Sequence, residues 1–292
     1  MPRPSTGGGA PAAGPYARAL IAFGTMHGKQ HQVAGSFAGI LHTRMVAPVG
    51  IDTDQFGTFA GEIPRTLTPI QAARAKARLA MTAVDTPYGL ASEASYGPLP
   101  GLPVPGHEEM LLFLDDTRGI EILEGERSLD VPWSPRRVTD TAEAAAFLAG
   151  VGFPAQAVIV HAAQGPAGLA LVKGIADLAA LAHAITSACQ ASPDGHAVVE
   201  ADLRAQHNPT RRRLLTRLGQ RLAHRLAIPC PACRCPGYGR TGTEPGLPCA
   251  ACDTPTHLAA ADVHSCARCP HRHRVPRPDL TADPQWCDRC NP

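Results

Sequence analysis

Eight cysteines near the end of the chain form four C-x-x-C pairs, a pattern typical of metal sites. Nine of the ten cysteines in the 292-residue sequence lie between Cys230 and Cys290. One C-x-x-C pair puts two thiolates on a single turn, and two such pairs complete the tetrahedral shell that zinc prefers. We therefore predict two structural Zn²⁺ sites. Their ligands are the cysteines of the four pairs, Cys230, Cys233, Cys249, Cys252, Cys266, Cys269, Cys287 and Cys290.

Each C-x-x-C pair is a knuckle, and the spacing leaves the pairing of the four knuckles open. Consecutive pairing is the simplest assignment, and an interleaved pairing of the first knuckle with the third is the alternative. Cys235 lies beside the first knuckle, and we expect that it is not a ligand. The histidines that could replace a cysteine are His257, His264, His271 and His273. Bound zinc would supply the folding stability of this segment, which has few apolar residues, and closed four-cysteine shells leave no open position for catalysis.

A second group of polar residues lies between Ile51 and Gly97, with little apolar bulk around it. A loop carries Asp52, Asp54, Glu62 and Arg65, a helix carries Lys76, and a short strand delivers Ser92, Glu93 and Ser95 into a turn closed by Gly97. Carboxylates are preferred ligands of Mg²⁺, and lysines can balance the remaining charge of a polyphosphate. We interpret this stretch as a catalytic phosphate and metal site, in which Glu62 and Glu93 bind Mg²⁺ or Mn²⁺ and Lys76 contacts phosphate. A surface helix with solvated charges is the alternative.

A turn between a predicted strand and a predicted helix offers a place for a phosphate. The strand (residues 17–23) leads into Thr25, His27, Gly28 and Lys29, and the helix is predicted over residues 30–41. Backbone N–H groups at a helix N-terminus attract anions, and Lys29 adds a positive charge. We assign these four residues to phosphate binding, although the turn lacks the spacing of a P-loop. An ordinary turn with a solvated lysine is the alternative.

Four motifs occur in one order, GTMHGK, FGTFAGEIPR, AARAKA and GLASEASYG. This order, over residues 17–123, resembles the inosine-triphosphate pyrophosphatase superfamily, which includes the inosine/xanthosine triphosphatases. The resemblance implies that Lys29 and Lys76 bind phosphate and that Glu62 and Glu93 are the acids of the metal site. It also implies hydrolysis of a nucleotide phosphoanhydride. His27 stands where that family has asparagine, and a single Glu93 stands where many members have paired aspartates.

Nearly the whole chain resembles an uncharacterised bacterial family of unknown function. The residues that carry this resemblance are the motif ADLRAQHNPTR and a double C-x-x-C tail that ends in CNP. Within the motif, Arg204 and His207 follow a predicted strand (residues 197–200) and precede a predicted helix, so we assign them to phosphate binding as well. Asn208 is expected to cap that helix, with Pro209 at its first position.

The segment between Arg204 and Arg225 has seven arginines and no acidic residue. A basic helix can bind phosphate backbones. The plainer interpretation places arginines on the solvent side of a helix whose leucines form an apolar stripe.

Strands that alternate with helices predict an α/β fold, with a mixed or mostly parallel sheet and flanking helices. Further strands are predicted over residues 44–48, 108–115, 119–123 and 157–161, and further helices over 139–149 and 175–189. Beyond Pro229 this periodicity vanishes. We therefore expect a disordered tail (1–15), an α/β domain (16–228) and a small double zinc-ribbon module (229–292).

Composition narrows the function only slightly. A net charge of +2 gives no general argument for nucleic-acid binding, and no apolar run is long enough to span a membrane. The N-terminus lacks the apolar core of a secretory signal, so we expect a cytoplasmic protein. The leading hypothesis is a metal-dependent hydrolase of a nucleotide phosphoanhydride. The alternative is a non-enzymatic protein that binds a nucleotide, or that binds nucleic acid or protein through its zinc ribbons.

Overall fold

The fold is described from a computed structural model, which covers residues 14–57, 63–99, 104–131 and 134–292. Most of the tail that we expected to be disordered (1–15) lies outside these ranges, and so does Glu62. Within the described residues, no helix is both long and apolar enough to cross a membrane.

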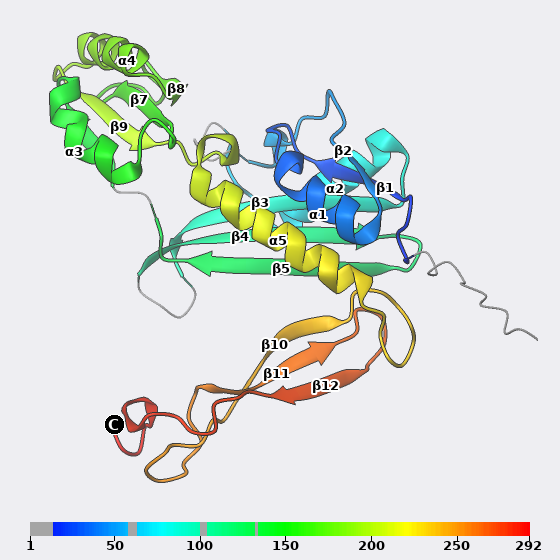
Figure 1. The fold of residues 1–292 in the computed structure, drawn as a ribbon. Helices are drawn as coiled ribbons and strands as arrows, with labels where there is room; N and C mark the ends of the chain where they lie inside the picture. Colours follow the sequence, from blue (N-terminus) through cyan, green and yellow to red (C-terminus); the bar gives the residue numbers. More distant parts are fainter. Residues whose placement is uncertain (1–13, 58–62, 100–103, 132–133) are drawn as a thin grey trace, which may run out of the picture.

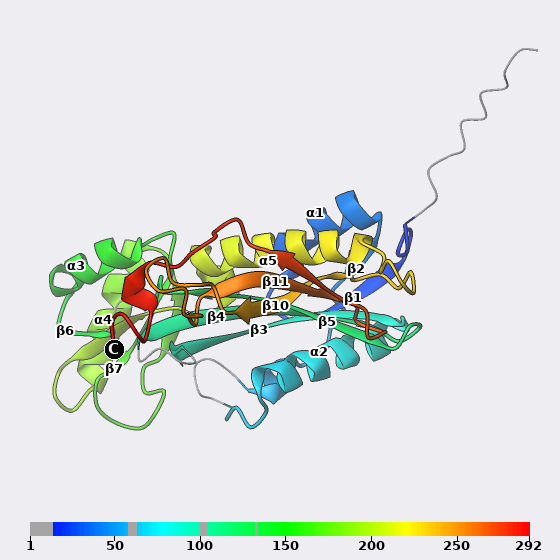
Figure 2. The ribbon, with the colours of Figure 1, turned by 90° about the horizontal axis from the view of Figure 1, so that it is seen from below.

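A five-stranded mixed sheet forms the centre of the molecule, in the order β2-β1-β3-β4-β5. Strands β1, β2 and β3 run parallel, whereas β3, β4 and β5 form an antiparallel meander. Helices α1 and α5 lie side by side on one face, and α2 covers the other face (Figures 1 and 2). The predicted α/β class with a mixed sheet is therefore confirmed. The elements are β1 (Leu20–Gly24), α1 (Gln30–Leu41), β2 (Arg44–Val46), α2 (Pro69–Val84), β3 (Tyr88–Pro98), β4 (Pro105–Asp115), β5 (Ile120–Ser128) and α5 (Pro209–Ala227).

Helix α2 lies unusually close to the sheet because its inner face is made of small residues. Ala73, Ala77 and Ala80 are fully buried. A Cβ added at Gly24, the last residue of β1, would lie 2.2 Å from the carbonyl oxygen of Lys76. Glycine at this position therefore allows the contact that brings Lys76 to the end of β1.

Strand β1 stops in the middle of its longer neighbour β3. Gly24 pairs with Ala91, and β3 continues for seven residues, to Pro98, without β1 beside it. The predicted short strand with a turn closed by Gly97 is wrong. Glu93 lies within β3 and pairs with Met110 of β4, because the β3–β4 register runs unbroken from Tyr88 to Pro98. One edge of β3 is thus open beyond the end of β1.

A second sheet lies at one end of the central sheet and has the order β6-β9-β7-β8. All its strand pairs are antiparallel. Helices α3 and α4 pack with it around a separate apolar core that includes Phe147, Val160 and Leu181. We call this part the insert, and its elements are β6 (Arg136–Val138), α3 (Thr141–Val151), β7 (Val158–Ala162), β8 (Val172–Ile175), α4 (Leu178–Ala191) and β9 (Ala197–Ala201).

The C-terminal segment projects away from the central sheet as an antiparallel meander (Figure 1). Its strands are β10 (Gly239–Pro245), β11 (Ala259–Ser265) and β12 (Arg272–Pro276). We expected a small double zinc-ribbon module here but assigned no strands to it. The strands carry few apolar side chains, so they lack the alternation by which a strand is recognised in a sequence.

Candidate functional site

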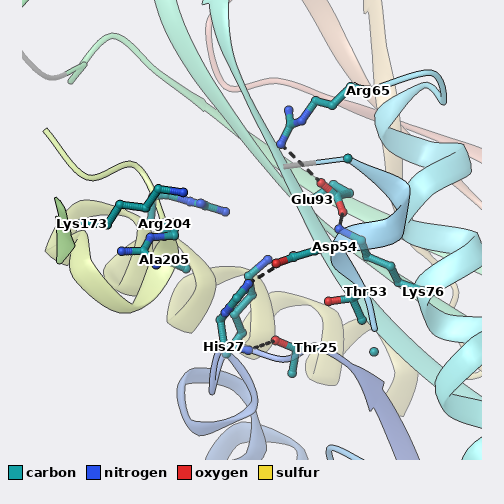
Figure 3. A pocket seen from close by; sticks show the side chains of 14 residues that line it. Thr25, His27, Thr53, Asp54, Arg65, Lys76, Glu93, Lys173, Arg204 and Ala205 are labelled. Atoms are coloured by element: carbon teal, nitrogen blue, oxygen red, sulfur yellow. Dashed lines mark hydrogen bonds and ion pairs between the residues drawn. The ribbon is translucent and has the colours of Figure 1, made fainter. Parts of the chain in front are cut away.

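A cavity lies where β1 ends and the edge of β3 becomes open. Its volume is about 90 Å³, against about 30 Å³ for one water in the liquid. It therefore has room for a small group such as a phosphate. The side chains that line it come from β1, α2, β3, α5, the insert and the loops between them (Figure 3). They are Gly24, Thr25, His27, Lys29, Thr53, Asp54, Gly57, Arg65, Lys76, Glu93, Lys173, Arg204, Ala205 and Arg211.

The open edge of β3 is covered by cationic side chains instead of a neighbouring strand. The Lys29 ammonium donates to the carbonyl oxygen of Ser92 at 3.5 Å, and Arg65 Nη1 donates to that of Ala94 at 3.1 Å. Carbonyls two residues apart on a strand point the same way, so both donors serve one edge. The interrupted sheet therefore fixes two positive charges beside the cavity.

Glu93 is buried in the wall of the cavity and lies between two cations. It forms an ion pair with the Lys76 ammonium, and Arg65 lies at 4.0 Å. The side chains of Lys76 and Glu93 are only 10% and 6% exposed. A buried carboxylate with cationic partners is already neutralised, which disfavours a role as a metal ligand.

The described carboxylates around the cavity do not fit a Mg²⁺ or Mn²⁺ ion. Magnesium requires several oxygen ligands in a nearly octahedral arrangement. Among the described residues, the groups of three or more potential metal ligands are the two cysteine groups, and neither contains a carboxylate. Glu62, the other acid that we assigned to this metal, lies outside the described residues.

His27 and Asp54 form a second polar pair on the cavity wall. His27 Nε2 lies 3.3 Å from Asp54 Oδ1, and the backbone N–H of His27 donates to Thr25 Oγ1 at 3.1 Å. The aspartate is held in place because Asp52 accepts the backbone N–H of Asp54 at 2.9 Å. This pair thus brings an oriented imidazole to a cavity lined by cations, although the sequence alone identified only its separate members.

Three basic residues face the cavity from the side of the insert and helix α5. Lys173 belongs to β8, Arg204 follows β9, and Arg211 lies in the first turn of α5. Arg204 is oriented by the buried Asp202, with Nε–Oδ1 at 3.0 Å and Nη2–Oδ2 at 2.5 Å. In Figure 3, Lys173 and Arg204 lie across the cavity from Arg65.

Arg211 and Glu109 were not identified from the sequence, although they form the most deeply buried ion pair of this site. Both side chains are at most 1% exposed, and the bidentate contact has Nε–Oε2 at 2.7 Å and Nη2–Oε1 at 3.0 Å. Arg211 Nη1 also donates to the Leu203 carbonyl at 2.7 Å. One signal was present in the sequence: Arg211 lies four residues before Leu215, on the buried stripe of α5.

The predicted phosphate-binding residues are brought together only in part. Thr25, His27, Lys29 and Arg204 line the cavity, whereas Gly28 and His207 do not. Gly28 has a positive φ of 66°, as the turn into α1 requires. His207 lies next to Gly174, since a Cβ there would approach its Nε2 to 3.0 Å. Burial lowers the pKa of His207.

Lys29 differs from the other cations in its electrostatic setting. Burial of its ammonium, followed by repulsion from Arg211, lowers its pKa to about 8. Its hydrogen bond goes to a neutral carbonyl, and no carboxylate of the described residues lies within ion-pair distance. Lys29 is therefore the cavity cation whose charge a bound anion would stabilise most.

The eight cysteines form two groups of four that could each hold a zinc ion. Within each group the sulfurs all lie within 4.8 Å of one another. Tetrahedral zinc with bonds of about 2.3 Å holds its sulfurs about 3.8 Å apart. Cys230–Cys269 and Cys249–Cys290 match this geometry, with Sγ–Sγ distances of 3.8 and 3.9 Å. Hydrogen bonds with Thr254 lower the pKa of Cys252, whereas the hydrogen bond with Cys252 raises the pKa of Cys290 in the same group.

The groups are interleaved, so the consecutive pairing is wrong and the alternative is observed. The first group is Cys230, Cys233, Cys266 and Cys269, and the second is Cys249, Cys252, Cys287 and Cys290. The meander explains the pairing. Because β10, β11 and β12 alternate in direction, the first and third knuckles meet at one end and the second and fourth at the other.

The remaining features of the C-terminal segment are structural in character. Cys235 is 4% exposed and packs in the main hydrophobic core rather than in a cysteine group, and none of the described histidines joins such a group. Several arginines pair with acids of the same meander. These pairs are Arg240–Asp262, Arg277–Asp262 and Arg274–Glu244. They neutralise much of the positive charge that nucleic-acid binding by this segment would need.

Comparison with known proteins identifies a family but no activity. No curated protein and no solved structure matches the chain. A family model described as a domain of unknown function (DUF6671) matches residues 76–292. The matched region contains Lys76, Glu93, Arg211 and both cysteine groups, and the strand and turn that carry Lys29 precede it. Since the match covers well over half of the chain, the protein belongs to the DUF6671 family of domains of unknown function.

Proposed function

We propose that the cavity binds the phosphate groups of a nucleotide. One observation carries this proposal: six basic side chains from separate parts of the chain converge on a cavity, and they outnumber the two acids that line it together with the two, Asp202 and Glu109, that pair with them from behind. Gathering like charges is unfavourable unless an anion neutralises them. The acids present are engaged, Glu93 with Lys76 and Asp54 with His27. A nucleotide is the ligand class that the resemblance to the inosine-triphosphate pyrophosphatases implies.

The lysines and arginines of the cavity would contact the phosphates in different ways. Lysine binds phosphate as a point charge, whereas arginine donates two parallel hydrogen bonds to phosphate oxygens. Lys29 would supply the charge at the end of β1. Arg204 and Arg211, which are oriented by Asp202 and Glu109, would supply rigid donors from the opposite side.

Isothermal titration with pyrophosphate and with a nucleoside triphosphate tests this proposal. We expect Lys29→Met to lower the affinity for both ligands by roughly tenfold, because one charge-assisted hydrogen bond contributes about that factor. Arg74→Gln is the matched control, because Arg74 lies on α2 but pairs with Glu121 outside the cavity. Equal affinities of wild type and Lys29→Met, or no binding by the wild type, would refute the proposal.

The His27–Asp54 pair favours a second candidate function, hydrolysis of a phosphoanhydride. Asp54 would accept the Nε2–H of His27 and hold the tautomer in which Nδ1 can take a proton. A water oxygen would attack phosphorus, its proton would pass to His27 Nδ1, and the anhydride oxygen would leave with the electron pair of the broken bond. The cavity cations would stabilise the charge that develops on the phosphoryl oxygens.

Phosphate release from a panel of nucleoside triphosphates tests this second candidate. His27→Asn keeps a polar side chain but lacks the base, so turnover should fall by at least about 100-fold. Triphosphate affinity should change little. Turnover that persists in His27→Asn would exclude His27 as the base, and binding without turnover in the wild type would leave a binding protein.

A further inference from the structure

A groove between the N-terminal halves of helices α1 and α5 carries positive charge and no negative charge. Its volume is about 880 Å³, and none of the described residues that line it is acidic. Its basic residues are His31 on α1 and Arg212, Arg213 and Arg217 on α5, and Gly35 and Ser36 form part of its α1 wall. Helices α1 and α5 contain no aspartate or glutamate along their whole length.

The arginines at the start of α5 are unfavourable for the helix itself. The N-terminal end of a helix carries partial positive charge, which attracts anions and repels cations. Arg212 and Arg213 nevertheless lie there, and no acidic residue occurs in the first turn. A helix stabilised by its own charges would have acidic residues near its N-terminus and basic residues near its C-terminus.

The arginines of α5 fall into two classes by their partners. Arg217, Arg221 and Arg225 pair with Glu124 and Glu126 of β5. Arg212 and Arg213, in contrast, hydrogen-bond only neutral groups among the described residues, the Gln206 carbonyl and the Thr210 hydroxyl. Neither Arg212 nor Arg213 forms an ion pair among the described residues, although Asp130 accepts a hydrogen bond at 3.2 Å from the same Thr210 hydroxyl that Arg213 contacts.

The groove and the cavity adjoin at the N-terminal ends of α1 and α5. Arg211 lines the cavity, and Arg212, the next residue, lines the groove. His207 lies near both sites: it lies against Gly174 together with Arg204 of the cavity, and Arg212 of the groove donates to the carbonyl of Gln206, the residue before it. A chain of phosphates could therefore pass from the cavity into the groove without leaving positive surroundings.

We propose that the groove binds the phosphodiester backbone of a single-stranded nucleic acid, with a terminal phosphate of that strand in the cavity. The groove follows α5 from Pro209 to Thr216 and Arg217, about 12 Å at 1.5 Å per residue, which is longer than one phosphate group. Arginine suits phosphate oxygens through its planar fork. Among the described residues that line the groove there is no Phe, Tyr or Trp, and His31 is the one ring on which a base could stack, so binding should depend little on sequence. The position of the terminal phosphate rests on the proposed function of the cavity, whereas binding by the groove does not.

Fluorescence anisotropy of the full-length protein with labelled single-stranded DNA tests this inference. The probes are one oligonucleotide with a 5′-phosphate, with a 3′-phosphate or with neither. We expect one phosphorylated form to bind best, and we expect log K to fall linearly with log salt. Arg213→Gln should lower the affinity for all three probes by roughly tenfold. It should also reduce the slope of log K against log salt concentration by about 0.7. Arg221→Gln is the matched control on the same helix, because it removes the same charge and Arg221 is not among the described residues that line the groove.

The outcomes separate the groove from the cavity. Lys29→Met should remove the advantage of the terminal phosphate and leave the effect of Arg213→Gln intact. Equal effects of Arg213→Gln and Arg221→Gln would overturn the groove proposal. A competition experiment gives a second criterion. If polyglutamate displaces the labelled DNA as effectively as unlabelled DNA does, the groove proposal is overturned and an acidic protein is the better candidate for the groove. Failure of pyrophosphate to bind the cavity would refute the proposed function alone.

Discussion

Lys76 and Glu93, seventeen residues apart in the sequence, form an ion pair between helix α2 and strand β3. Both side chains are buried, and Arg65 approaches the same carboxylate. The pair joins α2 to the part of β3 that β1 leaves uncovered. The role that follows from this position is structural: the pair forms part of the cavity wall.

Glu93→Gln should destabilise the fold without weakening anion binding. Loss of the carboxylate leaves Lys76 buried beside Arg65 without a counter-charge, which costs about 3–5 kcal/mol for a buried pair. The cavity also becomes more positive, so pyrophosphate should bind at least as tightly as to the wild type. Urea denaturation and titration of the same samples measure both effects. A wild-type free energy of unfolding with lost ligand binding would instead indicate that Glu93 holds a metal.

Anion binding should weaken as pH rises through about 8. Lys29 is protonated below its pKa of about 8 and loses its charge above it, so affinity should fall by at most about tenfold per pH unit. Stability should change in the opposite direction. A lysine whose pKa is lowered from 10.5 destabilises the folded state at neutral pH, and this cost is relieved between about pH 8 and 10.5.

Comparison of the wild type with Lys29→Met and Lys29→Arg isolates this group from other titrations. Lys29→Arg keeps the charge and should bind pyrophosphate with the same affinity at pH 7 and pH 9. The same pH profile in all three proteins would contradict the assignment of the effect to Lys29.

The interleaved zinc sites predict how double substitutions affect metal content. Cys233→Ser with Cys266→Ser disables one site and should leave about one zinc per chain, because the second site keeps four thiolates. Cys233→Ser with Cys252→Ser disables both sites and should leave almost none. Zinc analysis after gel filtration distinguishes the two variants. Consecutive pairing requires the reverse result.

The Arg211–Glu109 pair should show strong coupling in a double-mutant cycle. Arg211→Leu leaves the buried carboxylate of Glu109 with His107 as its remaining side-chain hydrogen-bond partner among the described residues, and about 3–5 kcal/mol of stability should be lost. Arg211→Leu combined with Glu109→Leu should recover much of that loss, because no buried charge remains without a partner. Denaturation of the four proteins gives the coupling energy, and additive losses would show that the two side chains act independently.

Local patterns in the sequence predicted the helices well. The predicted bounds of α1 are those observed, and Asn208 caps α5 by accepting the backbone N–H of Arg211, with Pro209 at the first position. These features depend on residues close in the chain. Thr25, His27 and Lys29 follow β1, as local patterns indicated, whereas Glu93 was expected at the end of a strand and lies within β3.

Features that depend on distant partners could not be predicted from the sequence. The length of β3 is set by its register with β4, so the GLA segment looked like a short strand. The partner of Arg211 lies 102 residues away, and the pairing of the cysteine knuckles follows from strand directions in a meander with little apolar alternation. In each case the deciding contact joins segments that the sequence does not link.

The interleaving of the knuckles sets an order of assembly. Neither metal shell can close until Cys269 has left the ribosome, because each shell joins one early and one late knuckle. When the first shell closes, the second knuckle (Cys249 and Cys252) still lacks a metal. Its shell can be completed only after Cys290 has also been synthesised. A premature stop between Cys269 and Cys287 should thus yield a chain with one filled shell and one pair of reactive thiols. A stop before Cys266 should yield four stranded thiols and no complete shell.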